Sequence, residues 1–500
     1  MNRSEATGFL EQIRAHPEDD APRLVYADWL DEHGDGPRAE FIRVQIERAR
    51  LPRWDGRQVA LKVRESALLT EHGEAWRKEL PTLDRVVWGG FRRGFVATAE
   101  FHAFSALGWN AKAAWDAAPI ELVRVRWPRR DEPTGSIPPV PHLRELSITR
   151  RLVDADDMVR LAEAPVLSTL HTLTIDDASI GPDAFRRLCR SPHVKGLRAL
   201  RVPKNAIGNG GVRVLAETDP MPGLAELDLS ERGIYGRYGE DPIVDAEGVA
   251  ALAAWPGLAR LHTLTLNGDD AGLEGLVALL MSPHAVGLKH LGLRENNLDG
   301  DALQAFGVAR AGLMLETLDV GMNNLQLGGA DRLAGAPCLR ELKILNVDQC
   351  EIGLADIRKL FKAPFMGSLR VLNADFNSMG TKGLSALLKA SPPELHTLHL
   401  QSNDLANSAV KALAASPAAD GLRHLDLSYN PFDHVGAKAL AETPHLKNLV
   451  VLRVEGGSLG LAGMKVLQDS ALAKRLGALQ GLPTGRTVPP VTGDGDEMPF

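Results

Sequence analysis

A short leucine pattern recurs along most of this 500-residue chain and limits what it can fold into. The pattern is L-x-x-L-x-L, with Ile, Val or Ala at some later positions, and its starts are 27 residues apart except for one interval of 37 and one of 26. A large apolar residue follows 18 residues after each start, or 28 residues after it in the repeat that is longer by ten residues. Self-similarity at such a fixed period indicates stacked structural repeats. The twelve starts are Leu143, Leu170, Leu197, Leu224, Leu261, Leu288, Leu315, Leu342, Leu369, Leu395, Leu422 and Leu449.

Each repeat has the pattern of one strand followed by one helix. The alternating leucines place apolar side chains on one face of a short strand, and second halves such as GLSALLKA have helical spacing. One such unit cannot bury a core alone, but stacked copies can. Parallel strands lie about 4.8 Å apart whereas helices need roughly 10 Å, so the stack must bend with its strands inside. We therefore predict an α/β solenoid of horseshoe form, with parallel strands on the concave face and helices on the convex face.

A polar residue eight positions after the start predicts a hydrogen-bonded ladder through the stack. Asparagine occupies this position in six repeats, and its amide can both donate to and accept from the backbone groups where each strand ends. Cys350 occupies the same position, and we interpret it as a structural substitute and not as a reactive thiol. The predicted ladder residues are Asn205, Asn296, Asn323, Cys350, Asn377, Asn403 and Asn430.

The order LxxLxLxxN plus a helical half, as in LRHLDLSYNPFDHVGAKALAETPHL, resembles the leucine-rich repeats of the ribonuclease-inhibitor type. The resemblance covers residues 143–475 and implies a solenoid whose concave surface binds another macromolecule. It does not imply ribonuclease as the partner. Arg151, Ala178, Arg232, Asp269 and Gly457 stand where the pattern has asparagine, so we expect the first two repeats and the last one to be caps.

The chain before residue 143 has a different character and holds seven of the eight tryptophans. Its string HPEDDAPRLVYADWLDEHGDGPRAEFIRVQ resembles a small bacterial repeat-companion domain found ahead of leucine-rich repeats. We expect a helical companion domain over residues 1–50, with Asp20 capping its second helix. Over residues 51–142 we expect a connecting helix and two degenerate capping repeats. Residues 482–500 are rich in Pro, Gly and acids and are expected to be disordered.

Charge and composition argue against several classes of function. The net charge is −7, from 57 basic and 64 acidic residues, which disfavours nucleic-acid binding by phosphate neutralisation. The three cysteines have no close pair, so no disulfide framework or cysteine zinc site is predicted. No leader-like segment or run of 18 apolar residues occurs, so we expect a cytoplasmic chain without a membrane span. No cofactor or metal site is predicted, and the acidic run from Asp28 to Asp35 is interpreted as solvated helix-end charge.

The predicted concave face is mildly acidic, which fits either ordinary solvated sheet polarity or a docking surface for a basic protein partner. The longest repeat carries ten extra residues, Tyr235–Val244, which we interpret as an exposed loop. Its tyrosines are either interface anchors or incidental surface residues. The candidate partner-binding residues are Tyr235, Tyr238, Asp375, Phe376, His399, Gln401, His424, Asp426 and Tyr429.

A histidine, an aspartate and a serine on one predicted strand suggest a second interpretation. His424, Asp426 and Ser428 alternate along this strand, and His399 is expected beside Asp426. Alternate residues of a strand are about 6.6 Å apart, which is beyond direct contact between a nucleophile and its base. An inert surface pair and a partner-binding site therefore compete with catalysis, and we expect His399 and Tyr429 to face solvent.

The sequence favours a non-catalytic protein-interaction scaffold. The alternative is an enzyme or nucleic-acid-binding module that uses the His/Asp cluster or the N-terminal block. In that block basic residues lie close in sequence to Trp88 and Trp127, an arrangement suited to binding single-stranded nucleic acid. These basic residues are Arg92, Arg93, Arg124, Arg126, Arg129 and Arg130.

Overall fold

The computed structural model describes residues 3–126, 140, 143–149, 155–231, 243–326 and 328–480. It divides into two compact units. Among the described residues, the first unit runs to Pro52 and resumes at Leu61 as far as Leu229. The second consists of Arg53–Ala60 and the chain from Ser230 onward.

The first unit joins a helical region to a sheet. Strand β1 is antiparallel to β4, strands β4 to β9 follow one another in parallel, and β2 and β3 form a separate hairpin. Its helices are α1 (Arg3–Ala15), α2 (Ala21–Glu32), α3 (Gly36–Arg50), α4 (Arg57–Lys78, whose first turn belongs to the second unit), α5 (Phe104–Ala117), α6 (Ala155–Ala162), α7 (Pro182–Cys189) and α8 (Gly208–Thr218). Its strands are β1 (Val86–Trp88), β2 (Phe91–Arg92), β3 (Phe95–Val96), β4 (Thr98–Phe101), β5 (Leu122–Arg126), β6 (Glu145–Thr149), β7 (Thr172–Asp176), β8 (Ala199–Arg201) and β9 (Glu226–Asp228).

An apolar cluster holds the first three helices together. Ile13 from α1, Trp29 from α2 and Ile42 from α3 are buried in it. Asp20 precedes α2 as expected, but its side chain caps no amide and instead forms ion pairs with Arg50 and Arg93. The prediction of a side-chain cap was therefore wrong, because two guanidinium groups engage this carboxylate.

The second unit repeats one strand and one helical segment. All of its strands are parallel and neighbours in sequence are neighbours in the sheet. The strands are β10 (Thr263–Thr265), β11 (His290–Gly292), β12 (Thr317–Asp319), β13 (Ile344–Asn346), β14 (Val371–Asn373), β15 (Thr397–His399), β16 (His424–Asp426), β17 (Val451–Arg453) and β18 (Ala478–Gln480). The α-helices are α10 (Ala246–Ala254), α11 (Gly272–Met281), α12 (Gly329–Ala334), α13 (Leu354–Leu360), α14 (Gly380–Ala390), α15 (Asn407–Ala414), α16 (His434–Ala441), α17 (Gly460–Gln468) and α18 (Ala471–Arg475), and a 3₁₀-helix, η5 (Ala302–Val308), serves between α11 and α12.

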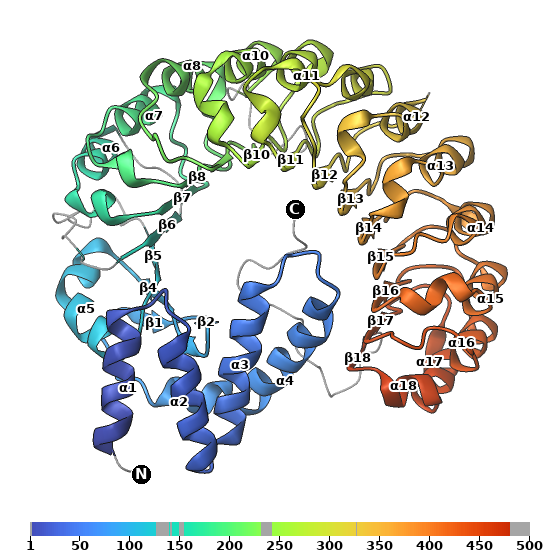
Figure 1. The fold of residues 1–500 in the computed structure, drawn as a ribbon, viewed down its shortest axis with the longest axis horizontal. Coiled ribbons are helices and arrows are strands. Elements are labelled where there is room, and N and C mark those ends of the chain that lie inside the picture. The colour runs from blue at the N-terminus through green and yellow to red at the C-terminus, as the bar shows by residue number, and fades with distance from the viewer. Residues whose placement is uncertain are drawn as a thin grey trace. The chain divides into compact units, whose positions relative to one another are not determined.

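The leucine pattern sets the layers of this unit. Equivalent residues of successive repeats are paired, as with Leu398 and Leu425 on β15 and β16. Within the unit the strands line the inner side and the helices the outer side (Figure 1), and the repeat leucines fill the space between them. Leu395, Leu398 and Leu400 are all at most 5% exposed. The architecture is therefore the α/β leucine-rich-repeat solenoid that the spacing predicts.

The side chains of the six asparagines eight residues after the starts hydrogen-bond to backbone groups of the preceding repeat and of their own repeat. Asn430 shows the pattern: its Oδ1 accepts from the amides of Asn403 and Leu405 at 3.0 Å each, and its Nδ2 donates to carbonyls of Leu400 and Leu427 at 2.8 and 3.0 Å. Cys350 is buried at the equivalent position, with its thiol 3.1 Å from the Val320 carbonyl. Burial raises the pKa of this thiol, which suits a structural and not a reactive cysteine.

Candidate functional site

Side chains four residues after the repeat starts form the first row of the inner wall in the second unit. Strand pairing places Asp319, Asn346, Asn373, His399 and Asp426 side by side in this order. Four of the five accept a hydrogen bond from the backbone amide two residues further on, as Asp426 does from Ser428 at 2.9 Å. These acceptors bind backbone amides that follow the ends of the strands and have no partner in the sheet. The row therefore has a structural role that does not depend on any partner.

The second row, six residues after the starts, is also engaged within the chain. Asp375 accepts from the Gln401 amide at 2.6 Å, and Ser428 accepts from the Glu455 amide at 3.1 Å. Arg294 and Asp348 form a two-bond ion pair. Gly321 lies between them in the row. The position favours glycine, because a Cβ there would clash with both charged groups.

Burial changes the protonation of this wall. It raises the pKa of Asp319 to about 6 and that of Asp375 to about 7, because both carboxylates are withdrawn from water. The Asp348 carboxylate is paired with Arg294, and Asp426 lies 3.8 Å from Arg453. The inner wall therefore carries less negative charge near neutral pH than its composition predicts.

His399 differs from our expectation. Strand pairing places it opposite Asp426 as predicted, but its side chain is buried with 5% exposure and does not face solvent. Its ring lies edge-on to that of His424 at 4.7 Å, and its Nε2 has no hydrogen-bond partner among the described residues. Burial lowers the pKa of His399, so the ring is held neutral.

The arrangement lacks the contacts of a Ser-His-Asp triad. The carboxylate of Asp426 accepts from the Ser428 amide, and the Ser428 hydroxyl accepts from the Glu455 amide. Both groups are buried and serve the backbone. The triad interpretation therefore has no geometric support in this unit.

Two aromatic side chains stand out at the next position, seven residues after the starts. Phe376 and Tyr429 are 47% and 54% exposed. Both adopt a left-handed backbone, with φ of 56° and 55°, and their amides donate to the next repeat's carbonyls at Gln401 and Glu455. Ser402 holds the same position in the repeat between them. We call Phe376, Ser402 and Tyr429 the exit edge, because each follows the end of a strand.

The extra loop of the long repeat is only partly accounted for. Tyr235 and Tyr238 lie outside the described residues. Val244, which we had placed at the end of the loop, is fully buried, and its amide donates to Asp269 Oδ1 at 2.9 Å. The expected exposed loop is therefore too long by at least its last residue, Val244, which belongs to the core. Asp269 accepts a hydrogen bond at the ladder position in place of asparagine.

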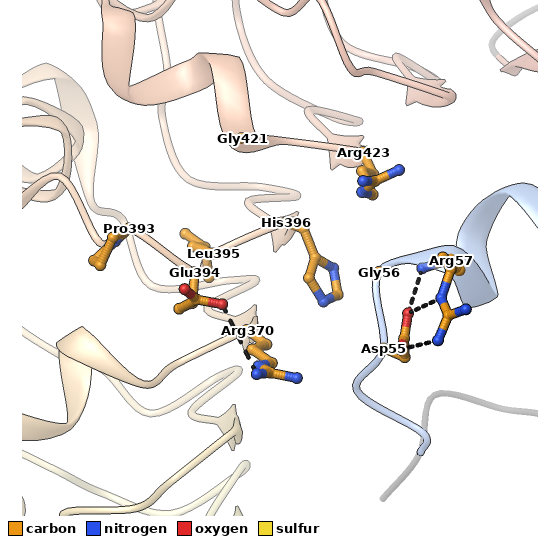
Figure 2. A pocket seen from close by; sticks show the side chains of 10 residues that line it. All are labelled: Asp55, Gly56, Arg57, Arg370, Pro393, Glu394, Leu395, His396, Gly421 and Arg423. Atoms are coloured by element: carbon orange, nitrogen blue, oxygen red, sulfur yellow. Dashed lines mark hydrogen bonds and ion pairs between the residues drawn. The ribbon is translucent and has the colours of Figure 1, made fainter. Parts of the chain in front are cut away.

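A polar pocket of about 260 Å³ lies at the opposite end of the strands. We call Arg370, His396 and Arg423 the start edge, because each precedes a strand, β14, β15 or β16. The loop Asp55–Arg57 and residues Pro393–Leu395 and Gly421 complete the lining. Figure 2 shows the loop facing His396, with Arg423 and Arg370 on either side of that histidine.

The loop is held by specific contacts. His396 Nε2 lies 2.9 Å from the Trp54 carbonyl, and its Nδ1 lies 3.0 Å from the Thr397 hydroxyl. Gly56 packs so closely on the start edge that a Cβ would come within 2.9 Å of Arg423 Nε. Sequence reasoning missed this pocket, although the Arg-His-Arg order at equivalent positions of consecutive repeats is a visible signal.

Several charged groups of the N-terminal block form ion pairs within the first unit. Arg43 bridges Asp28 and Asp31 at 2.7 Å each, and no group of metal-ligating residues occurs in the described chain. Arg92 pairs with Glu145 and Arg126 with Glu100. Trp127, Arg129 and Arg130 lie outside the described residues. These ion pairs weaken the nucleic-acid interpretation, since the guanidinium groups already have anionic partners.

No described helix has the combined length and hydropathy needed to cross a membrane.

Comparisons with known proteins found a family match and similar solved structures. A family described as "Leucine Rich repeat" matches residues 393–414 and 422–441. Among solved structures, an internalin from Listeria monocytogenes is similar at 15% identity and a TM-score of 0.38, covering 72% of this chain and 87% of its own. The yeast Rad7–Elc1 complex contains a chain similar at 14% identity and a TM-score of 0.45, covering 91% and 94%. Curated proteins yield no match. With its parallel strands, outer helices and recurring leucines, the chain has the fold of a leucine-rich-repeat solenoid.

Proposed function

We propose that this protein is a non-catalytic scaffold that binds a protein partner through the exit edge of β14–β16. The observation that carries the proposal is the exposure of Phe376 and Tyr429 two strands apart. Large aromatic side chains are frequent anchors of protein interfaces, and a left-handed backbone keeps both of these out of the core.

The polar residues of the inner wall contribute less to partner binding than the composition of the wall predicts. Asp375, Gln401, His424 and Asp426 line the wall beside the aromatic residues, but the aspartates also accept backbone hydrogen bonds. We therefore propose that the aromatic contacts supply most of the affinity. The carboxylates would then add preference for a basic partner.

The alternative of an enzyme has weaker support. The hydroxyl and carboxylate that a triad needs are used for backbone hydrogen bonds, and His399 is buried.

The double variant Phe376→Ala/Tyr429→Ala tests the proposal. We expect partner capture from native lysate, measured by quantitative mass spectrometry, to fall by about tenfold or more, as for loss of two interface anchors. Thermal stability should change little, because exposed side chains contribute little to it.

The matched control is Leu461→Ala, which removes an 80% exposed apolar side chain from α17 in the same unit. Capture should persist in this control. Undiminished capture by the folded double variant would refute the exit edge as the binding site. Hydrolase activity of the pure protein that disappears in Ser428→Ala would overturn the scaffold assignment.

A further inference from the structure

The start-edge pocket has the chemistry of a separate ligand site. Arg370, His396 and Arg423 directly precede three neighbouring strands, and the backbone carbonyl of each of the first two accepts a hydrogen bond from the amide of the next. The two arginines therefore flank the histidine at a distance of about two strand spacings, roughly 10 Å between backbones. Arginine side chains are long enough for both to contact one ligand placed over such a distance.

The histidine between them contributes no charge. Its two ring nitrogens are both engaged, one with the Trp54 carbonyl and the other with the Thr397 hydroxyl. A carbonyl only accepts, so Nε2 carries the proton and Nδ1 accepts from the hydroxyl. Burial and the two arginines lower the pKa of His396 in agreement with this neutral form.

The arginines are incompletely satisfied by the chain itself. Arg423 forms no ion pair with any described carboxylate, and Arg370 Nε is buried without a hydrogen-bond partner in the described structure. Glu394 is the ion-pair partner of Arg370, at 3.8 Å, and its side chain is 55% exposed. The remaining carboxylate of the pocket, Asp55, is held by two bonds from the Arg57 guanidinium at 3.1 and 2.9 Å.

We propose that this pocket binds the phosphate group of a small phosphate monoester between Arg370 and Arg423. Guanidinium groups present paired donors that match phosphate oxygens, and a phosphate carries nearly two negative charges at neutral pH. The loop Asp55–Arg57 closes one side of the 260 Å³ space, which suits a small molecule better than a polymer. This site is independent of the exit edge, which lies at the other end of the same strands.

Isothermal titration calorimetry of the full chain with inorganic phosphate and with glycerol 3-phosphate tests this assignment. Chloride at matched ionic strength is the reference. We expect saturable binding, weakened about tenfold or more in Arg423→Gln and in Arg370→Gln, because each removes one charge-assisted contact. Arg423→Lys should retain part of the affinity for phosphate, since lysine keeps the positive charge but lacks the paired N–H donors of the guanidinium group.

The control Arg358→Gln removes the same charge from an exposed position on α13 of the same unit and should bind like the wild type. A thermal melt of each variant checks folding. Absence of saturable phosphate binding, or unchanged affinity in folded Arg423→Gln and Arg370→Gln, would overturn the proposal. Tighter binding of a single-stranded oligonucleotide with steep salt dependence would overturn the small-molecule assignment.

Discussion

The exposed exit edge and the polar positions on either side of it differ sharply although they are adjacent in sequence. Ser428 and Asn430 are buried with 3% and 2% exposure, whereas Tyr429 between them is 54% exposed. The exposed ring of Phe376 is likewise followed by a buried asparagine, Asn377. A single left-handed residue reverses the direction of the side chain, so backbone conformation and not polarity decides what a partner can reach.

Side chains of the two kinds of position have different roles. The polar side chains of the inner wall and the ladder hydrogen-bond to backbone groups inside the stack, so their loss should cost stability. Phe376 and Tyr429 at the exit edge are exposed and make no side-chain hydrogen bond among the described residues, so their loss should cost binding. The following variants test this division in order of expected effect.

Asn430→Ala should have the largest effect on stability. It leaves the amides of Asn403 and Leu405 without their acceptor and several carbonyls without a donor. We expect the free energy of unfolding of this region to fall by roughly 3–5 kcal/mol, measured by urea denaturation. Asn448→Ala, which removes one exposed side-chain hydrogen bond, should cost about 1 kcal/mol or less. Equal losses in the two variants would contradict the ladder.

Gly321→Ala should have an intermediate effect. The new methyl group would lie against the Arg294–Asp348 ion pair, which must shift to make room. We expect a loss of about 1–3 kcal/mol by the same measurement. Gly307→Ala is the control, since nothing lies within 4 Å of a Cβ at that position. If both variants unfold alike, the ion pair does not depend on the glycine.

Asp375→Asn should change how stability depends on pH. Burial raises the Asp375 pKa from an ordinary 3.8 to about 7, so between these values the folded chain binds more protons than the unfolded chain. The Asp375 contribution to the unfolding free energy therefore falls as pH rises through this window. Asparagine keeps an acceptor for the Gln401 amide but does not titrate.

The stability of Asp375→Asn relative to the wild type should consequently be greater at pH 8 than at pH 4. Thermal melts of both proteins across this pH range measure the difference. Glu455→Gln, which changes an exposed carboxylate at the equivalent position of a later repeat, serves as the comparison variant. A difference that is flat with pH for Asp375→Asn would show that its carboxylate is not withdrawn from water.

Cys350→Asn should have the smallest effect, and in the opposite direction. The new asparagine would have the same side-chain amide as Asn323 and Asn377, which hold the equivalent positions of the neighbouring repeats. At present the Cys350 thiol faces the Val320 carbonyl there. We expect stability to stay equal or to rise by about 1 kcal/mol. A melting temperature several degrees lower would show that this repeat is shaped for the thiol.

The repeat, its strand and helix order and the polar position eight residues after each start were all readable from the sequence. The physical reason is that each repeat has the same local pattern, and only one way of stacking buries every leucine and pairs every asparagine. The exposed pair Phe376 and Tyr429 was also among the predicted residues.

The tertiary structure decided what surrounds each of these positions. Burial of His399 and the protonation of Asp375 depend on neighbours from other repeats, and the Arg294–Asp348 pair reaches across Gly321. The contact between Trp54 and His396 joins residues 342 positions apart, with no periodicity linking them. Local pattern determines a repeat because its interactions recur at a fixed spacing, whereas a contact made once between distant segments becomes visible only when the chain is folded.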